Sequence, residues 1–210
     1  MTNEAMQKEV ALAMTGASGA QYGLRLLDCL LGAGRRVHLM ISKPARIVIG
    51  TETDTQLPTR AAETVRFLAE RNNVPEERIR VYGQDEWTAP VASGSGAPGA
   101  MVVCPCTTGT LANIALGSSR SLIERAADVA LKERRRLILV PRETPLSELH
   151  LENMLKLARM GAVMLPANPG FYHRPESING LVDFVVARVL DHLDVDQGLV
   201  PRWGRSEEES

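Results

Sequence analysis

Residues 10–23, VALAMTGASGAQYG, decide the fold of this chain. The first five residues are apolar without interruption, which is typical of a strand that is buried on both faces. After a turn of small residues, apolar residues recur at helical spacing: Ala20, Leu24, Leu27 and Leu31. We therefore predict a strand, a tight turn at residues 15–19 and a helix. Glycines allow such a turn, and the N–H groups at the helix start favour an anion or an electron-rich ring.

This turn does not by itself identify a ligand. The chain lacks the full G-x-G-x-x-G spacing of a dinucleotide-binding turn. The next strand-like run, RRVHLMIS, is followed by Lys43, so that Ser42 and Lys43 stand where a ribose-binding acid is expected. An ordinary turn between a strand and a helix is therefore the alternative interpretation.

The composition is that of an ordinary globular protein. Hydrophobic residues make up 44% of the 210 residues and charged residues 23%, so the chain can form both a core and a solvated surface. We expect one domain over residues 1–210, with a core from about residue 10 to about residue 194 and a tail at residues 195–210.

Charge and hydropathy argue against several classes of protein. A formal net charge of −1 gives no footprint for nucleic acid. We expect no secretory or membrane-spanning segment, and hence a cytoplasmic protein, because the longest apolar runs are only as long as strands. Three cysteines suit a reducing compartment, and the four histidines show no spacing typical of metal ligands, so we expect no metal site.

Strand-like and helical patterns alternate along the chain. The strand-like runs are residues 10–14, 37–41, 79–82, 100–103, 137–140 and 162–165. Helical spacing of apolar residues follows at residues 61–71, 121–133, 148–160 and 178–190. This alternation predicts an α/β fold, a single Rossmann-like (flavodoxin-like) domain with a mostly parallel sheet and helices on both faces.

Residues with functional side chains follow five of these strands. The segments are TGAS at 15–18, ISK at 41–43, CPCTTGT at 104–110, VPRETP at 140–145 and LPANPGFY at 165–172. Ligands of parallel sheets bind beyond the carboxyl ends of the strands, so we expect the site at this edge. Turn formation alone does not readily explain hydroxyl groups, charges and rigid turns in all five segments.

Two sets of residues are candidate phosphate ligands. In the segment 106–110, threonine hydroxyls and helix-start N–H groups suit a phosphate monoester, although Thr107 or Thr108 could equally cap the helix that follows. Arg125 and Lys132 lie seven residues apart on one helix face and suit a phosphate dianion. With Asp128 between them, they would alternatively form a solvated row of ion pairs.

Glu143 and Tyr172 are candidate functional groups in the last two segments. A glutamate at a strand end, partly desolvated beside arginines, suits proton transfer, and a structural contact within the loop is the alternative. Tyr172 follows a rigid Pro-Gly turn and can donate to an anion. Its alternative role is a hydrophobic plug with the hydroxyl at the surface.

Several segments together resemble one family, the UbiX-type flavin prenyltransferases. These segments are TGASGAQYG, SKxA at 42–45, TETD at 51–54, ERAADVALKERR, PRETP, HLENMLKL, GAV and PGFYHRP, so that the resemblance covers nearly the whole chain. It implies an enzyme that joins a dimethylallyl group, supplied as dimethylallyl monophosphate, to N5 and C6 of reduced FMN without a metal. The prenylated FMN would then pass to a UbiD-type decarboxylase, in many bacteria within the ubiquinone pathway.

The resemblance also implies roles for individual residues. FMN would be bound, with Ser18 near N5, by Gly16, Ala17, Ser18, Ser42, Thr107, Thr108, Gly109, Thr110 and Arg142. The phosphate of the prenyl substrate would be bound by Arg125, Lys132, Tyr172 and Arg188. The catalytic residues would be Ser18, Glu52, Lys132, Glu143 and Trp203. Glu143 would shuttle protons, and Trp203 would face a developing allylic cation or else anchor the C-terminal tail.

The family is dodecameric, which implies a homododecamer with sites at subunit interfaces, where some of these residues act on a neighbouring chain's flavin. The closest competing function is that of FMN-dependent decarboxylases of peptidyl or pantothenoyl cysteine, but these carry P-x-M-N where this chain has PRETP. A non-catalytic flavin-binding protein and a direct aromatic-acid decarboxylase also compete with the prenyltransferase interpretation.

Overall fold

The computed structural model describes residues 8–201. These residues form one six-stranded sheet in the order β3-β2-β1-β4-β5-β6, in which every neighbouring pair of strands is parallel. The strands are β1 Glu9–Met14, β2 Arg36–Ile41, β3 Ile79–Tyr82, β4 Ala100–Cys106, β5 Arg136–Pro141 and β6 Val163–Met164. The predicted α/β class is confirmed, and the strand order is that of the Rossmann fold.

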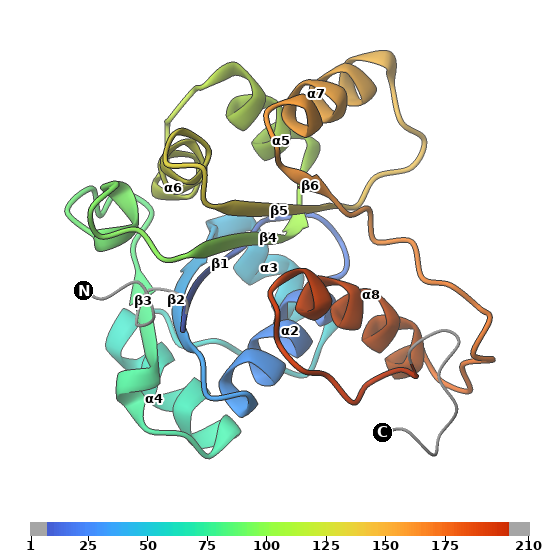
Figure 1. Cartoon of the computed structure of the whole chain (residues 1–210). Helices are drawn as coiled ribbons and strands as arrows, with labels where there is room; N and C mark the ends of the chain where they lie inside the picture. Colours follow the sequence, from blue (N-terminus) through green and yellow to red (C-terminus); the bar gives the residue numbers. More distant parts are fainter. Residues whose placement is uncertain (1–7, 202–210) are drawn as a thin grey trace.

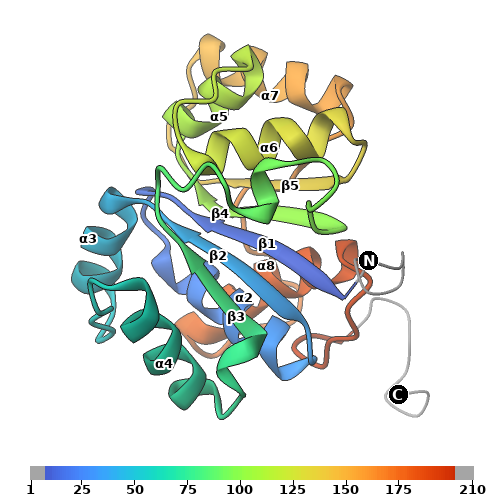
Figure 2. The same cartoon turned by 90° about the vertical axis from the view of Figure 1, so that its left-hand side faces the viewer.

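Helices cover both faces of the sheet. Within residues 8–201 they are α2 Ala20–Gly32, α3 Lys43–Glu52, α4 Ala61–Asn72, α5 Thr108–Leu116, α6 Leu122–Lys132, α7 Glu148–Arg159 and α8 Ile178–His192. Figure 1 shows α5, α6 and α7 above the sheet and α2, α3, α4 and α8 below it, and Figure 2 shows the same layers after a quarter turn. None of these helices is both long and apolar enough to cross a lipid bilayer.

The strands divide their side chains between two cores. On β1, Leu12 is buried on the side of α2 and α8, whereas Ala13 is buried on the side of α5 and α6. Val102 and Val103 of β4 divide in the same way. Burial of both faces explains why these strands are continuous apolar runs in the sequence.

A close approach of α2 to β4 positions the start of α2. A Cβ atom at Gly23 would lie 2.5 Å from the backbone oxygen of Cys104, so only glycine permits this contact. The helix also packs against α8, which lies on the same face of the sheet. The turn that precedes α2 is therefore held beside the carboxyl ends of β1 and β4.

The sequence patterns predicted all six strands and each helix except α3. Helix α3 begins with two recognised signals, because Ser42 caps its first turn through the Ala45 N–H and Pro44 lies at its start. Its interior, however, contains Ile47, Val48 and Ile49, and β-branched residues of this kind favour strands. The helix was therefore missed, although it carries Glu52 to the site.

Candidate active site

The carboxyl ends of β1 and β4 form a crevice at the point where the strand order reverses. The chain leaves β1 toward β2 and β3 on one side, and leaves β4 toward β5 and β6 on the other. Two turns therefore face each other there: the β1–α2 turn at residues 15–19 and the β4–α5 turn at residues 106–110. Such a switch point is where open parallel sheets bind ligands.

Two glycines shape the β1–α2 turn. Gly19 has φ 103°, in the left-handed region that favours glycine, and it immediately precedes α2. A Cβ atom at Gly16 would lie 2.5 Å from the Cβ atom of Pro44, the second residue of α3. The lack of a side chain at Gly16 thus brings the start of α3, with Ser42, against this turn.

Glu52 occupies the start of α2. Its Oε2 atom accepts hydrogen bonds from the N–H groups of Gly19 at 2.8 Å and of Ala20 at 2.9 Å. Burial opposes ionisation of this carboxyl, but hydrogen bonds from the Ser18 side chain and from these two N–H groups, together with the Arg142 charge, outweigh it and lower its pKa. The anion that this helix start favours is therefore supplied by the chain itself.

Arg142 ties β5 to the same turn. Its Nε donates to the backbone oxygen of Ser18 at 3.1 Å, and its own N–H approaches the Cys106 oxygen at 3.4 Å. The predicted flavin-binding residues of β1, β2 and β5 are thus brought together. The structure places Ser18, Ser42 and Arg142 around one end of the crevice.

The β4–α5 turn has free donors. Thr107 caps α5, because its Oγ1 accepts the Thr110 N–H at 3.1 Å and also bonds to the Thr110 hydroxyl at 2.9 Å. Among the described residues, the N–H groups of Thr108 and Gly109 have no hydrogen-bond partner, and the space beside Gly109 is open. Capping by Thr107 is confirmed, and it leaves the next two N–H groups available to an anion, so the two interpretations of this segment do not exclude each other.

The two helix starts differ in what they can bind. The start of α2 already holds a carboxylate, which repels a phosphate, whereas the start of α5 offers N–H groups and a nearby threonine hydroxyl pair. The donors at the start of α5 are of the kind that the phosphate of a flavin mononucleotide needs. Bound FMN would supply a reducible ring whose N5 and C6 positions accept new bonds.

Glu143 differs from its predicted environment. We expected it to be partly desolvated beside arginines, but within the described chain it is exposed and accepts the Thr144 N–H at 3.1 Å. It follows β5 directly, so it does lie at the carboxyl edge as predicted. Its burial would require another molecule.

The four predicted ligands of the prenyl phosphate fall into two groups within one chain. Arg125 and Lys132 lie on α6, above the sheet, where they pair with Asp128 at 2.9 Å and with Glu133. Arg188 lies on α8, below the sheet, and pairs with Asp191 at 2.6 Å. Tyr172 lines the same cavity as Arg188. A single chain therefore does not gather all four around one phosphate.

Lys132 is also far from Glu143 within the chain. Lys132 ends α6 just before β5 begins, whereas Glu143 follows the end of β5. Six strand residues at about 3.3 Å each separate the two edges by roughly 20 Å. Lys132 thus lies near the amino edge of its own sheet, opposite the crevice.

Two cavities lie away from the crevice. The larger, of about 1070 Å³, borders α8 and is lined by Tyr172, Arg188 and three aspartates, Asp191, Asp194 and Asp196. The smaller, of about 390 Å³, lies between α2, α8 and the segment after α3.

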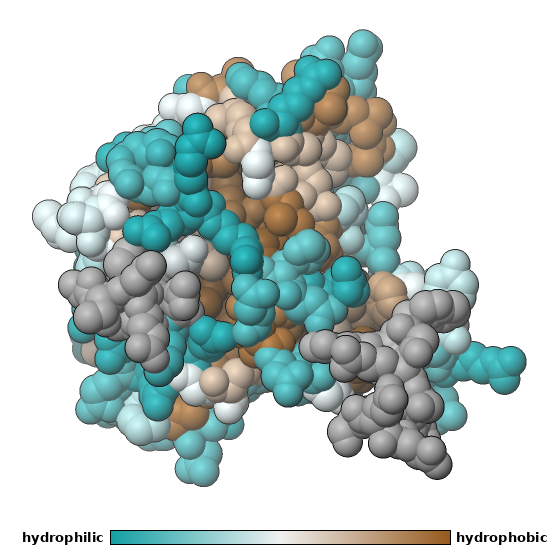
Figure 3. Space-filling model, in the orientation of Figure 1, coloured by the Kyte–Doolittle hydropathy of each residue, from teal (hydrophilic) through white to brown (hydrophobic). Residues whose placement is uncertain are grey.

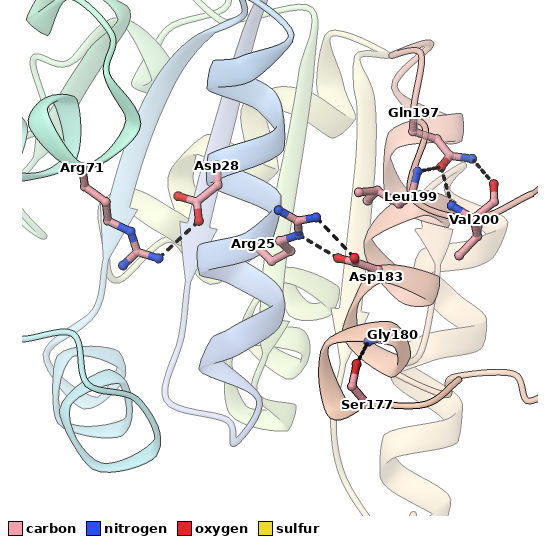
Figure 4. Close-up of polar contacts among 9 residues, drawn as sticks. All are labelled: Arg25, Asp28, Arg71, Ser177, Gly180, Asp183, Gln197, Leu199 and Val200. Atoms are coloured by element: carbon pink, nitrogen blue, oxygen red, sulfur yellow. Dashed lines mark hydrogen bonds and ion pairs between the residues drawn. The ribbon is translucent and has the colours of Figure 1, made fainter. Parts of the chain in front are cut away.

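Figure 4 shows the charged residues of the smaller cavity, together with the Gln197 turn near the end of α8. Arg25 pairs with Asp183 at 2.7 Å and Arg71 with Asp28 at 3.2 Å.

Other predicted features lie in the interior or outside the described residues. Cys104 and Cys106 are buried, and burial raises the pKa of Cys106 to about 12, which makes an unreactive thiol. Among residues 8–201, no three His, Cys, Asp or Glu side chains gather in a way that could hold a metal ion. Trp203 lies outside the described residues.

We predict that Glu52→Gln destabilises the chain by about 1–2 kcal/mol at pH 7, because the capping charge at α2 is lost. The pKa of Glu52 is lowered in the folded state, so its contribution is present above its ordinary value of 4.5 and is lost as the pH falls through the folded value. Urea unfolding at about pH 7 and about pH 3.5 should therefore show a difference from wild type that shrinks in acid.

Glu63→Gln is the matched control. Glu63 lies in the first turn of α4 but is exposed and pairs with exposed Arg60 at 3.4 Å. We expect a change of only a few tenths of a kcal/mol for this variant. Equal losses in the two variants, or a Glu52→Gln defect that does not depend on pH, would contradict the assigned role of Glu52.

Comparisons with known proteins identify the family. A family model described as Flavoprotein matches residues 1–190. Flavin prenyltransferase UbiX of Pseudomonas aeruginosa is 61% identical over 197 residues, which are 94% of this chain and 94% of that protein.

Solved structures agree with this match. The crystal structure of AnUbiX (PadA1) in complex with FMN and dimethylallyl pyrophosphate has a TM-score of 0.83 and 44% identity, over 95% of this chain and 98% of that one. A dodecameric FMN-dependent UbiX-like decarboxylase from Escherichia coli O157:H7 has a TM-score of 0.80 and 40% identity, over 94% of this chain and 100% of that one.

More distant structures share the fold alone. The FMN-dependent cysteine decarboxylase TvaF has a TM-score of 0.57 but only 18% identity, over 89% of this chain and 98% of that one. The family model covers residues 1–190, and the identity to a UbiX protein reaches 61% over 94% of the chain. This chain therefore belongs to the flavoprotein family and, within it, to the UbiX flavin prenyltransferases.

Proposed function

We propose that this chain transfers a dimethylallyl group from dimethylallyl monophosphate to reduced FMN. One bond forms to flavin N5, which gives up its proton as the phosphate leaves. A second bond forms between C6 and the prenyl alkene, which takes up a proton while C6 loses one, so that a fourth ring closes. The prenylated FMN then serves a UbiD-type decarboxylase. A cytoplasmic location and a single domain over residues 1–210 are part of this proposal, and the free thiols of Cys29, Cys104 and Cys106 support a reducing compartment.

The difference between the two helix starts carries the proposal. Glu52 closes the start of α2 to phosphate, and the N–H groups of Thr108 and Gly109 leave the start of α5 open. This supports an FMN that lies with its ring beside Ser18 and its phosphate at residues 107–110. The ring edge then faces Glu143 and Arg142 at the end of β5.

The predicted cations of the prenyl phosphate site, Arg125, Lys132 and Arg188, do not meet at this edge within residues 8–201 of one chain. Arg125 and Lys132 lie on the opposite sheet face from Arg188, and Lys132 lies near the amino edge. We therefore assign the second anion site to an interface, at which α6 of one copy approaches the carboxyl edge of another. Cations from neighbouring copies would stabilise the leaving phosphate without a metal.

Self-association has a candidate surface as well as this requirement. Exposed leucines gather on α7 and just before it: Leu146, Leu149, Leu151 and Leu155. Figure 3 shows hydrophobic side chains over this upper part of the molecule. An exposed apolar surface of this kind marks a protein interface, and a UbiX-like relative is dodecameric. We infer that a second copy of this chain covers it in a homo-oligomer, and that catalysis depends on this contact.

Of the competing functions, a cysteine-type decarboxylase is the least supported. The solved cysteine decarboxylase shares only the fold, and PRETP at residues 141–145 replaces the P-x-M-N segment of that class. The relative from Escherichia coli is described as a decarboxylase, so direct decarboxylation needs its own control. A flavin carrier would need neither Glu143 nor a second anion site.

The direct test is a mass measurement on the flavin. We expect the purified protein, incubated anaerobically with reduced FMN and dimethylallyl monophosphate, to yield a flavin heavier by one prenyl group. The diphosphate, which the AnUbiX structure contains, is assayed beside it. An aromatic acid supplied with FMN alone is the control. Carbon dioxide release from the acid with an unmodified flavin would instead establish a decarboxylase.

We predict that Glu143→Gln binds both substrates but forms the four-ring product at least about 100-fold more slowly, as expected when a proton-transfer group is removed. Departure of phosphate needs only cations, whereas ring closure removes the C6 proton and protonates the alkene. The flavin should therefore gain the prenyl mass without the spectrum of the closed ring. A wild-type rate of ring closure would show that Glu143 carries no proton.

Mixed oligomers test the interface assignment. Lys132→Ala and Glu143→Gln should each be inactive alone, but subunits of both kinds, co-expressed in equal amounts, should regain about a quarter of the wild-type activity. This gain is expected because each site takes Lys132 from one chain and Glu143 from another. Each of these chains carries the wild-type residue in about half of the cases, so about a quarter of the sites have both. A mixture no more active than either parent, with mixed oligomers present by mass, would place both residues in one chain's site.

A further inference from the structure

Thr15 joins the two turns of the crevice. Its hydroxyl donates to the backbone oxygen of Pro105 at 2.8 Å and accepts the N–H of Thr107 at 2.8 Å. Its backbone N–H also reaches the Pro105 oxygen, at 3.1 Å. The residue is 3% exposed, so water does not compete for these bonds. One buried hydroxyl thus connects segments about ninety residues apart in sequence.

These bonds begin where the strand ladder ends. The regular pairing of β1 with β4 stops at Ala13 and Val103, and the pairing of β4 with β5 changes register between Val103 and Cys106. Beyond this point, the hydroxyl and the backbone N–H of Thr15 continue the connection between β1 and β4, and the hydroxyl alone reaches the Thr107 N–H. The N–H that it accepts belongs to Thr107, the residue that caps α5.

The two turns depend on Thr15 to different degrees. The β1–α2 turn is also fixed by Glu52 at the N–H groups of Gly19 and Ala20, and by Arg142 at the Ser18 oxygen. The β4–α5 turn is held to β5 by the pairing of Cys106 with Pro141, and its connection to β1 is made by the hydroxyl and the backbone N–H of Thr15. Loss of the hydroxyl would leave the Thr107 N–H without its acceptor and shift the start of α5 relative to β1.

We propose that Thr15 is a positioning residue that sets where the α5 helix start holds the FMN phosphate relative to the flavin ring. This inference rests on the proposed function, in which the phosphate lies at residues 107–110. It predicts that Thr15 matters for a flavin with a phosphate and hardly at all for one without it. The difference arises because small displacements of preorganised donors weaken the binding of a charged group strongly.

The test compares FMN with riboflavin in Thr15→Val, which keeps the shape and removes both hydroxyl bonds. We expect FMN affinity, measured by quenching of flavin fluorescence, to fall about tenfold, while riboflavin affinity changes less than about twofold. Thr15→Ser keeps the hydroxyl and should restore the wild-type ratio of the two affinities. If Thr15→Val does not fold, Thr15→Cys, whose thiol makes weaker hydrogen bonds, should show an intermediate loss.

Thr64→Val is the matched control. Thr64 is fully buried, and its hydroxyl contacts the backbone oxygens of Pro58 at 2.8 Å and Arg60 at 3.0 Å, on α4 at the other side of the sheet. We expect this variant to lower the melting temperature without changing the ratio of FMN to riboflavin affinity.

Three outcomes would contradict these claims. A wild-type protein that binds FMN and riboflavin equally would refute the phosphate site itself, and with it the orientation of FMN in the proposed function. A wild-type protein that prefers FMN, with an unchanged preference in Thr15→Val, would leave that site intact and refute the role of Thr15. If Thr15→Val and Thr64→Val each lower the affinities for FMN and riboflavin by the same factor, Thr15 stabilises the fold and does not position the phosphate site.

Discussion

The parallel pairing of β1 with β4 is the interaction on which the candidate site depends. These two strands are central to the sheet, and the chain turns away from them in opposite directions. The chain segments that follow β1 and β4 therefore lie on opposite sides of the sheet, and a crevice remains between the β1–α2 turn and the β4–α5 turn. Thr15 extends this pairing beyond the ladder, so the separation of the two helix starts is fixed by hydrogen bonds from its hydroxyl and its own N–H to the backbone of residues 105 and 107. A ligand that spans both starts must match that separation.

The charge of Glu52 determines which of the two helix starts can bind a phosphate. Two helix starts that face one crevice would both attract phosphate, because each carries a partial positive charge. A carboxylate from the end of α3 satisfies the first, and its pKa is lowered by the same N–H groups that would otherwise bind the ligand. Of these two helix starts, the one of α5 then remains open to an anion. The first turn, with its glycines, can instead approach a flat ring closely, which gives a physical reason for a glycine-containing turn without the dinucleotide spacing.

Local patterns predicted the fold well because the central strands β1, β4 and β5 are apolar on both faces and the predicted helices carry regularly spaced apolar residues. The sequence pattern does not reveal helix α3, because its β-branched residues favour a strand while its capping signals favour a helix. Packing in the folded chain selects the helix. The strand ends correctly located Ser18, Ser42, Thr107 and Arg142 at one edge. The contact of Glu52 with α2 was not predictable, since it depends on a helix that the pattern did not reveal. Neither was the role of Thr15, whose partners are distant in sequence.

The catalytic groups raise a different problem, since local patterns and family resemblance both point to residues that one chain keeps apart. Lys132 lies near the amino edge, Arg188 lies below the sheet, and Glu143 is exposed at the carboxyl edge. Burial and neighbouring cations suit a carboxyl group to proton transfer, and burial of Glu143 requires a second molecule. In the proposed assembly one contact between copies provides both, because it covers Glu143 and brings cations to it. Chemistry at this edge would then begin only once the chains associate, and reactive allylic species would form only where water is excluded.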